Sequence, residues 1–182
     1  MDRARQVRVS KLLSLALRHD PAALSLALDP AGWTSVAAVL AGLAERGEGL
    51  SPDELVRVVA TSDKQRFALS EDGLRIRASQ GHSVDVDLGL PPSEPPETLF
   101  HGTAARVSSA IRREGLLPGS RTHVHLSADV RTAEIVAKRR AGPHMILRVR
   151  AAAMHAEGLV FFVSDNGVWL TEHVPPQFIE QP

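Results

Sequence analysis

A proline-rich segment near the middle of the chain limits what this sequence can fold into. Residues 91–97 contain four prolines, in a chain of 182 residues. Proline fixes φ and has no backbone N–H, so such a segment favours a stiff linker over a helix or a central strand. We therefore predict two small domains, at residues 1–90 and 98–182, joined by a linker at residues 91–97.

The composition excludes several classes of protein. Lys plus Arg and Asp plus Glu both total 21, so no global field attracts nucleic acid or an anionic membrane, and any phosphate binding must be local. The chain has no cysteine, which excludes disulfides, thiolate catalysis and thiolate-bound zinc. No apolar run reaches the roughly 18 residues of a membrane span, and the N-terminus has no apolar signal core. We expect a cytoplasmic protein with no membrane contact and no obligate protein partner.

Apolar periodicity in the first half predicts helices followed by a hairpin. A helix is expected at residues 5–19, where the apolar positions at helical spacing are Val9, Leu12, Leu13, Ala16 and Leu17. Ser51 with Glu54 three residues later forms a capping box at the start of another helix. The remaining elements are an extended piece at 24–28, a helix at 35–45, and a hairpin of 66–70 with 74–78. This pattern favours a winged helix, an architecture that often binds nucleic acid.

The second half mixes short strands and helices. Strands are predicted at 98–103, 144–149, 159–163 and 168–171, and helices at 104–114 and 129–140. Asp165-Asn166-Gly167 is a hairpin turn signal. The fold class of the chain is therefore predicted to be α+β.

An alternating stretch at residues 121–127 is the clearest candidate for a binding strand. Successive side chains of a strand point to opposite faces, so Thr122, Val124 and Leu126 should face the core. The polar side chains of the other face are Arg121, His123, His125 and Ser127. Four such groups could form the floor of a site for an anionic or polar ligand. The alternative is an edge strand with one solvated face.

Other polar residues resist a purely structural explanation. Arg18 and His19 end the first helix, Arg66 begins the hairpin, and His101-Gly102-Thr103 ends a strand. A phosphomonoester carries close to two negative charges, and guanidinium groups bind it bidentately. With Arg121, these residues could form a local anion-binding cage.

Seven segments of the chain match, in order, a known family of enzymes. They are Ser10-Lys11-Leu12-Leu13 with Leu17-Arg18-His19-Asp20-Pro21, Gly32-Trp33, Asp63-Lys64-Gln65-Arg66-Phe67, Gln80-Gly81-His82-Ser83, Leu99-Phe100-His101-Gly102-Thr103, the stretch 121–127, and the segment Ser164-Asp165-Asn166-Gly167-Val168-Trp169-Leu170-Thr171. On these segments the chain resembles the NAD-dependent RNA 2′-phosphotransferases. It departs from the family pattern at Ser62, Ser79, Ala137 and Gly119-Ser120.

The resemblance implies an N-terminal winged-helix RNA-binding lobe and a C-terminal ADP-ribosyltransferase-like, NAD-binding lobe, with the site between them. The catalytic set it implies is Arg18, His19, Arg66 and Arg121. The NAD-binding positions it implies are His101, Gly102, Thr103, His125, Ser127, Arg139 and Val168. NAD would be a co-substrate, no metal would be needed, and the partner would be RNA with a 2′-phosphate.

The resemblance also implies a reaction in two steps. The RNA 2′-phosphate attacks the anomeric carbon of the nicotinamide ribose and expels nicotinamide. The ribose 2″-hydroxyl then attacks that phosphate and releases RNA with a 2′-hydroxyl and ADP-ribose 1″,2″-cyclic phosphate. We expect the three arginines to clamp the phosphate, His19 to hydrogen-bond it or move a proton, and His101 with Thr103 to hold ADP-ribose.

Three other interpretations remain open. Two His-x-Ser/Thr motifs, His101-Gly102-Thr103 and His125-Leu126-Ser127, could form a two-histidine cyclic phosphodiesterase that needs no cofactor. The protein could be a non-catalytic winged-helix module that binds nucleic acid, in which Arg66 and Arg121 would affect only the affinity for RNA. A metal site at His123, His125 and His144 lacks a convincing carboxylate. No role follows from the sequence for His82.

Overall fold

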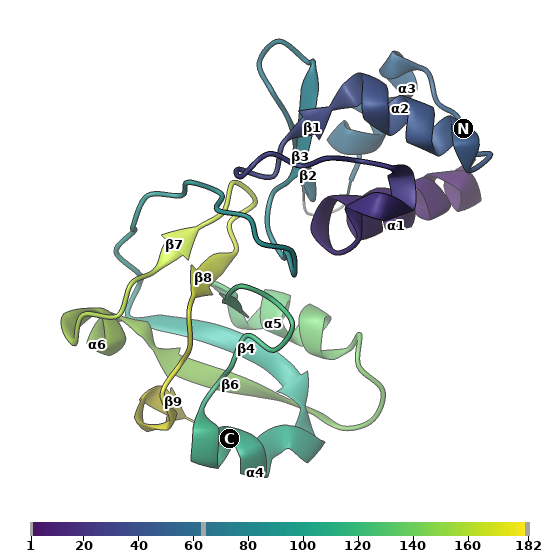
Figure 1. The fold of residues 1–182 in the computed structure, drawn as a ribbon. Coiled ribbons are helices and arrows are strands. Elements are labelled where there is room, and N and C mark those ends of the chain that lie inside the picture. The colour runs from purple at the N-terminus through teal and green to yellow at the C-terminus, as the bar shows by residue number, and fades with distance from the viewer. Residues whose placement is uncertain (1, 63–64, 181–182) are drawn as a thin grey trace. The chain divides into compact units, whose positions relative to one another are not determined.

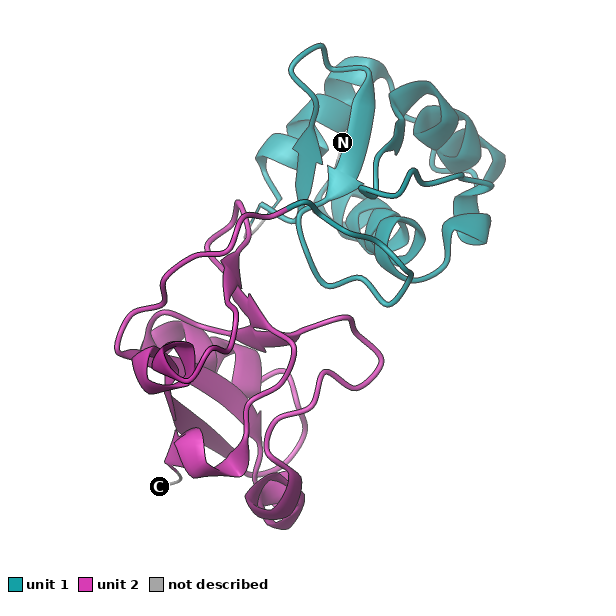
Figure 2. Ribbon diagram, turned by 60° about the vertical axis from the view of Figure 1, so that its left-hand side comes forward, with its two compact units in different colours: residues 1–89 teal, residues 90–182 magenta. Residues whose placement is uncertain are grey.

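The computed structural model describes residues 2–62 and 65–180. The chain forms two compact units, residues 1–89 and 90–182 (Figure 2). Each unit has its own cluster of buried apolar side chains. Both units mix helices with antiparallel strands, which confirms the predicted α+β class.

The first unit packs three helices against a small sheet (Figure 1). Its elements are α1 (Arg3–Arg18), a 3-10 turn (Pro21–Leu24), β1 (Thr34–Ser35), α2 (Val36–Glu45), α3 (Pro52–Ala60), β2 (Phe67–Leu69) and β3 (Arg75–Ala78). The strands form an antiparallel sheet in the order β1-β3-β2. The predicted hairpin is therefore present as β2 and β3. The piece expected to be extended at 24–28 instead begins inside a 3-10 turn, which Pro21 starts at its first position.

Local sequence signals explain the ends of α1 and α3. The Asp2 side chain accepts a hydrogen bond from the Arg5 N–H and caps α1, and His19 caps its C-terminus before Pro21. Ser51 and Glu54 form the predicted capping box of α3, with both reciprocal hydrogen bonds present. Four of the five predicted apolar positions of α1 are buried, and Leu12 is partly buried against the same core.

The second unit is built from two three-stranded sheets. Its elements are β4 (Thr98–Ala104), a 3-10 turn (Ala105–Val107), α4 (Ser108–Glu114), β5 (Val124–Leu126), α5 (Val130–Ala137), β6 (His144–Arg150), α6 (Ala151–Ala156), β7 (Phe162–Val163), β8 (Trp169–Thr171), a 3-10 turn (Pro176–Phe178) and β9 (Ile179–Glu180). The strand orders are β4-β6-β9 and β5-β8-β7. Phe100 and Ser127 exchange two backbone hydrogen bonds, which link β4 to the end of β5. Residues on β4 and β5 therefore become neighbours.

The segment predicted as a linker differs from the expectation. Residues 91–97 belong to the second unit, where Pro95 is buried and the Ser93 N–H donates to the Phe161 carbonyl at 2.8 Å. Proline has no N–H to satisfy, so an extended proline-rich segment can lie along a sheet edge with few hydrogen bonds.

The candidate binding strand is shorter than predicted. Only Val124–Leu126 is a strand, with Val124 and Leu126 buried, whereas Thr122 is exposed rather than in the core. The Arg121 N–H still donates to the Pro118 carbonyl, so the chain is turning until residue 123. The partner strand β8 also ends at Thr171, which pairs with Val124. Nothing in the described chain could cross a membrane as a helix.

Candidate functional site

Arg18 and His19 lie at the C-terminal end of α1, where a following loop holds them. The Ser83 N–H donates to the Arg18 carbonyl at 2.8 Å, across 65 positions of sequence. Gly81 packs beside the Arg18 guanidinium, because a Cβ there would lie 3.6 Å from Nη1. Arg18 Nη2 in turn donates to the Arg66 carbonyl at 3.3 Å. The structure therefore connects Arg18 directly to the backbone of Arg66.

Ser83 also contacts the ring of His19. Its Oγ lies 2.8 Å from His19 Nδ1, a hydrogen-bonding distance, and 3.5 Å from the Arg18 carbonyl oxygen. A bond to one ring nitrogen restrains the orientation of an imidazole and directs its other nitrogen outward. Sequence reasoning gave Ser83 no role, although it lies in one of the segments that match the family.

His82 is a buried histidine next to these groups. Its residue surface is 2% exposed, and its Nε2 has no hydrogen-bond partner among the described residues. Burial lowers the pKa of His82 to about 4, and the nearby charges of Arg18, His19 and Arg77 act in the same direction. The ring is therefore neutral at pH 7. It adds no positive charge to the neighbouring Arg18, His19 and Arg77.

Arg66 lies at the entrance to β2 in an unusual backbone setting. Gln65 before it has a φ of +41°, a conformation that costs a non-glycine residue energy. Ser79 restrains this turn, because its N–H donates to the Arg66 carbonyl at 3.0 Å and its hydroxyl donates to the Gln65 carbonyl at 2.8 Å. The serine that departs from the family pattern therefore holds the backbone beside Arg66. Asp63 and Lys64 of the same matching segment lie outside the described residues.

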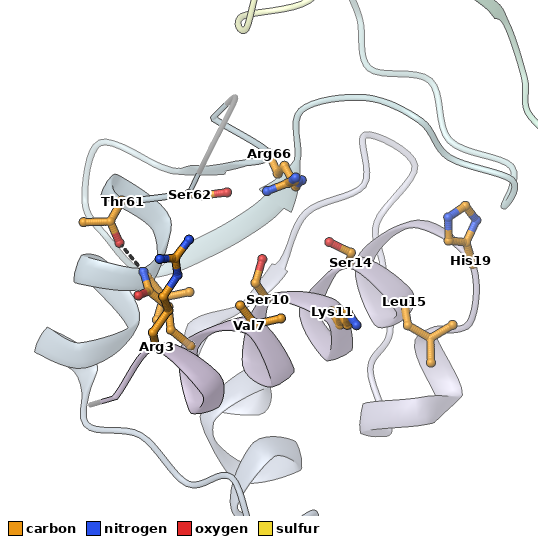
Figure 3. A pocket seen from close by; sticks show the side chains of 12 residues that line it. Arg3, Val7, Ser10, Lys11, Ser14, Leu15, His19, Thr61, Ser62 and Arg66 are labelled. Atoms are coloured by element: carbon orange, nitrogen blue, oxygen red, sulfur yellow. Dashed lines mark hydrogen bonds between the residues drawn. The ribbon is translucent and has the colours of Figure 1, made fainter. Parts of the chain in front are cut away.

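A pocket of about 560 Å³ opens beside α1 and contains both His19 and Arg66 (Figure 3). Its other lining residues are Arg3, Gln6, Val7, Ser10, Lys11, Ser14, Leu15, Val58, Thr61 and Ser62. The hydroxyls of Ser10 and Ser14 point from α1 toward the side of Ser62 and Arg66 (Figure 3). Among the described residues that line it, none is acidic. The pocket is therefore suited to an anion.

In the second unit, strand β4 presents His101 in a defined protonation state. Its Nδ1–H donates to the backbone carbonyl of His125 at 2.9 Å, so Nε2 of the neutral ring is an acceptor. Burial lowers the pKa of His101, and the charges of Arg140 and Arg121 lower it further, whereas the bond to His125 opposes the shift. A neutral imidazole at this position can accept a hydrogen bond from a hydroxyl group.

Gly102 allows α5 to pack directly on β4. A Cβ at this position would overlap the carbonyl oxygen of Ala133 and would lie 3.0 Å from the Cβ of Ala137. Packing therefore requires a glycine at this position of β4. Ala137, which departs from the family's glycine, is accommodated because Gly102 has no side chain. Thr103, the next residue, is 5% exposed.

Arg121 and His125 interact on the exposed side of β5. Arg121 Nη1 donates to His125 Nδ1 at 3.2 Å, so this ring nitrogen is the acceptor. Partial desolvation lowers the pKa of Arg121, and the charges of Arg140 and Arg139 add to this effect. Arg139 and Arg140 follow α5, and their effect on the pKa of Arg121 shows that they lie near it. The second unit thus gathers three arginines beside two histidines.

The remaining predicted positions border this group. Ser127 is joined to Phe100 by backbone hydrogen bonds of 2.7 and 2.9 Å, next to His101. Val168 follows the Asn166-Gly167 turn and lies opposite Ser127 when the β5–β8 register is extended by one residue. The described residues contain no group of three or more histidines and carboxylates arranged to hold a metal ion.

A family model described as RNA 2′-phosphotransferase, Tpt1 / KptA family, matches residues 4–173 of this chain. The chain belongs to this family. Similar family members include proteins named "Probable RNA 2′-phosphotransferase" from three bacteria. The protein from Hahella chejuensis is 53% identical over 93% of this chain and 91% of its own length. The one from Streptomyces griseus is 53% identical over 98% of both chains. The one from Agrobacterium fabrum is 55% identical over 93% of this chain and 91% of its own.

The predicted residues divide between the two units. Arg18, His19 and Arg66 meet in the first unit, and Arg121 lies in the second with the positions predicted to bind NAD. Arg140 and Ser83 were missed. Arg140 is one of three consecutive basic residues that the sequence also allows as helix-end charges, and Ser83 contacts His19 only through the fold.

Proposed function

We propose that the protein is an NAD-dependent enzyme that removes the 2′-phosphate of RNA in two steps. In the first, an RNA 2′-phosphate oxygen bonds to the anomeric carbon of the nicotinamide ribose as the bond to nicotinamide breaks. In the second, the ribose 2″-oxygen bonds to the phosphorus, and the RNA 2′-oxygen leaves and takes up a proton. The products are nicotinamide, 2′-hydroxyl RNA and ADP-ribose 1″,2″-cyclic phosphate.

The linked positions of Arg18 and Arg66 carry the proposal for phosphate binding. The bond from Arg18 to the Arg66 carbonyl fixes the two residues side by side, and Ser83 restrains His19 next to them. Fixed guanidinium groups bind a dianionic phosphate without further ordering, which favours both ground-state binding and charge growth in the second step. The phosphate is already an anion, so the first step needs orientation more than a general base. Family membership favours RNA as the carrier of this phosphate.

The second unit offers groups that fit a dinucleotide. Neutral His101 has an acceptor nitrogen for a ribose hydroxyl, since burial and its bond to His125 keep Nδ1 protonated and Nε2 free of a proton. Arg121, Arg139 and Arg140 supply the positive charge that a pyrophosphate or the transferred phosphate requires. The dinucleotide would supply the electrophilic carbon, and this chain would orient the reactants and stabilise their charge.

The topology of each unit supports the proposed lobe architecture. In the first unit, the chain order α1-β1-α2-α3-β2-β3 with sheet order β1-β3-β2 is the arrangement expected of a winged helix. In the second, short antiparallel sheets with an acceptor histidine on one strand support an ADP-ribosyltransferase-like, NAD-binding lobe.

A 2′-phosphorylated RNA oligonucleotide incubated with and without NAD tests the proposal, with all products followed by mass spectrometry. We expect dephosphorylated RNA and the cyclic phosphate of ADP-ribose only when NAD is present. Phosphate release or opening of a cyclic phosphodiester without NAD would favour the two-histidine phosphodiesterase instead. Binding of the RNA without turnover would favour a non-catalytic binding module.

A further inference from the structure

Helix α1 carries two kinds of basic residue that differ in their partners. Arg8 Nε lies 2.6 Å from Glu48 Oε1, and Arg5 Nε lies 3.5 Å from the other oxygen of the same carboxylate. Within residues 2–62 and 65–180, no carboxylate forms an ion pair with Arg3, Lys11 or Arg66. These three residues, Arg3, Lys11 and Arg66, all line the pocket.

The pocket-lining residues of α1 form a continuous stripe. Positions 3, 6, 7, 10, 11, 14 and 15 line the pocket and recur at helical spacing, so they share one face of the helix. The opposite wall comes from the end of α3 and the entrance to β2, through Thr61, Ser62 and Arg66 (Figure 3). Gln6 Nε2 donates to Thr61 Oγ1 at 2.7 Å and ties the two walls together. We call this surface the α1 groove.

Three serine hydroxyl groups in the α1 groove have no hydrogen-bond partner among the described residues. Ser10 and Ser14 make no side-chain hydrogen bond within the described chain, and both point into the groove. The Ser62 Oγ is buried and also has no partner among the described residues. Buried polar groups in folded proteins are rarely unsatisfied, and phosphate oxygens are strong acceptors for hydroxyl donors.

We propose that the α1 groove binds the sugar–phosphate backbone of the RNA strand that flanks the 2′-phosphorylated nucleotide. This inference rests on the proposed function, because His19 and Arg66 at one end of the groove would hold the reacting phosphate. From Arg3 to Arg18 the helix rises about 22 Å, so the groove can follow several nucleotides of one strand. Among the described residues that line it there is no Phe, Tyr or Trp, which predicts recognition of the backbone without base preference.

Equilibrium binding of a fluorescein-labelled RNA decamer with one internal 2′-phosphate tests this inference. The test variants are Arg3→Gln, Lys11→Gln and the double variant. Arg8→Gln is the matched control, because it removes the same charge from the same helix at an ion-paired position. Melting temperatures of all variants verify that they are folded.

We expect the double variant to bind the decamer about tenfold more weakly at 0.1 M salt, and Arg8→Gln to stay within twofold of the parent protein. The slope of log K against log salt concentration should fall by about 0.7 for each phosphate of the single strand that a variant no longer neutralises. Equal affinities and equal salt slopes for the double variant and Arg8→Gln would overturn the inference.

Turnover separates this inference from the proposed function. If the parent protein shows no NAD-dependent turnover, the proposed function fails, and the binding data still decide the role of the groove. If the parent protein does turn over, we compare the kcat/KM of the double variant with that of the parent on two substrates. The fold-reduction should be about five times larger on the decamer than on a trinucleotide with a central 2′-phosphate. An equal loss on both substrates would place these cations at the reacting nucleotide and contradict a flanking-strand role.

Discussion

The two units position their polar residues by different physical means. In the first, Arg18, His19 and Arg66 lie at the ends of secondary-structure elements. A loop containing Ser83 holds Arg18 and His19, and Arg18 donates to the Arg66 carbonyl. In the second, His101 and His125 lie within strands, and the backbone of one strand bonds the side chain of the other. The first arrangement depends on long-range loop contacts, whereas the second depends on strand register.

This difference has a consequence for mutation. A loop-held group can shift when a single hydroxyl is lost, while the rest of the unit stays folded. A strand-held group moves only when the sheet or the helix that packs on it moves. Variants in the first unit should therefore affect activity more than stability, and packing variants in the second should affect both.

Loss of an arginine that we propose to bind phosphate should have the largest effect. Arg18→Ala, Arg66→Ala and Arg121→Ala should each lower kcat/KM for 2′-phosphorylated RNA by about 10²–10³-fold, because each removes a positive charge that we propose to bind the transferred phosphate. Steady-state assays with saturating NAD measure this, with the exposed Arg46→Ala as the control. Near-parental rates for all three variants would disprove the proposed phosphate clamp.

Gly102→Ala tests the strand-held arrangement. The added methyl group overlaps the Ala133 carbonyl, so α5 must move away from β4, and overpacking of this kind costs about 1–3 kcal/mol. Urea unfolding should show this loss together with a raised KM for NAD. Gly49→Ala, where the new Cβ makes ordinary contacts at 3.5 Å, should change stability by less than about 0.5 kcal/mol. If Gly102→Ala lowers the stability but leaves the KM for NAD unchanged, the packing of α5 on β4 does not affect NAD binding, and the prediction is wrong.

His82→Gln tests whether His82 is neutral in the folded protein, as its lowered pKa predicts. The folded pKa of His82 is about 4, below the ordinary 6.5, so between these values the unfolded chain binds a proton that the folded chain does not. Stability should therefore fall as pH drops below 6.5. From pH 7 to pH 5 the parent protein should lose about 2 kcal/mol through this group, and His82→Gln should lose correspondingly less. Urea titrations at both pH values measure the difference. An equal loss in both proteins would show that His82 titrates normally.

Ser83→Ala should have the smallest effect on activity, and the effect should be limited to kcat. Without the hydroxyl, His19 loses its fixed orientation, and we expect kcat to fall about three- to tenfold with an unchanged KM for NAD and an unchanged melting temperature. Ser83→Thr keeps the hydroxyl and should restore most of the rate. Failure of the threonine to restore activity would indicate that the loop, and not its hydrogen bond, matters.

Sequence patterns predicted much of each fold. Helical spacing located α1, the Ser51–Glu54 capping box located α3, and turn signals located both hairpins. Helix α6 was missed because its six residues are too few to show a period. Strand β1 has two residues and exists only because they pair with β3. The alternation at 121–127 overestimated β5, since a pattern cannot show where the partner strand ends.

The candidate site was predictable to the extent that it depends on residue types. The arginines and histidines were predicted because their sequence segments match the family and because such groups suit a phosphate. The hydrogen bonds and packing that arrange them were not predicted. His19 and Ser83 are 64 positions apart, and the approach of Arg140 to Arg121 depends on how α5 packs. Long-range pairs of this kind leave no periodic signal in one sequence.

The two stripes of α1 cannot change independently. One stripe consists of Val9, Leu13 and Leu17, whose side chains are buried in the core. The other stripe lines the α1 groove. Successive residues of the helix are rotated by about 100°, which fixes the angle between the two stripes. Insertion or deletion of one residue within α1 would turn apolar side chains to water and bury cations in the same step. The length of this helix is therefore under two constraints at once, and the segment should accept substitutions far more readily than any change of register.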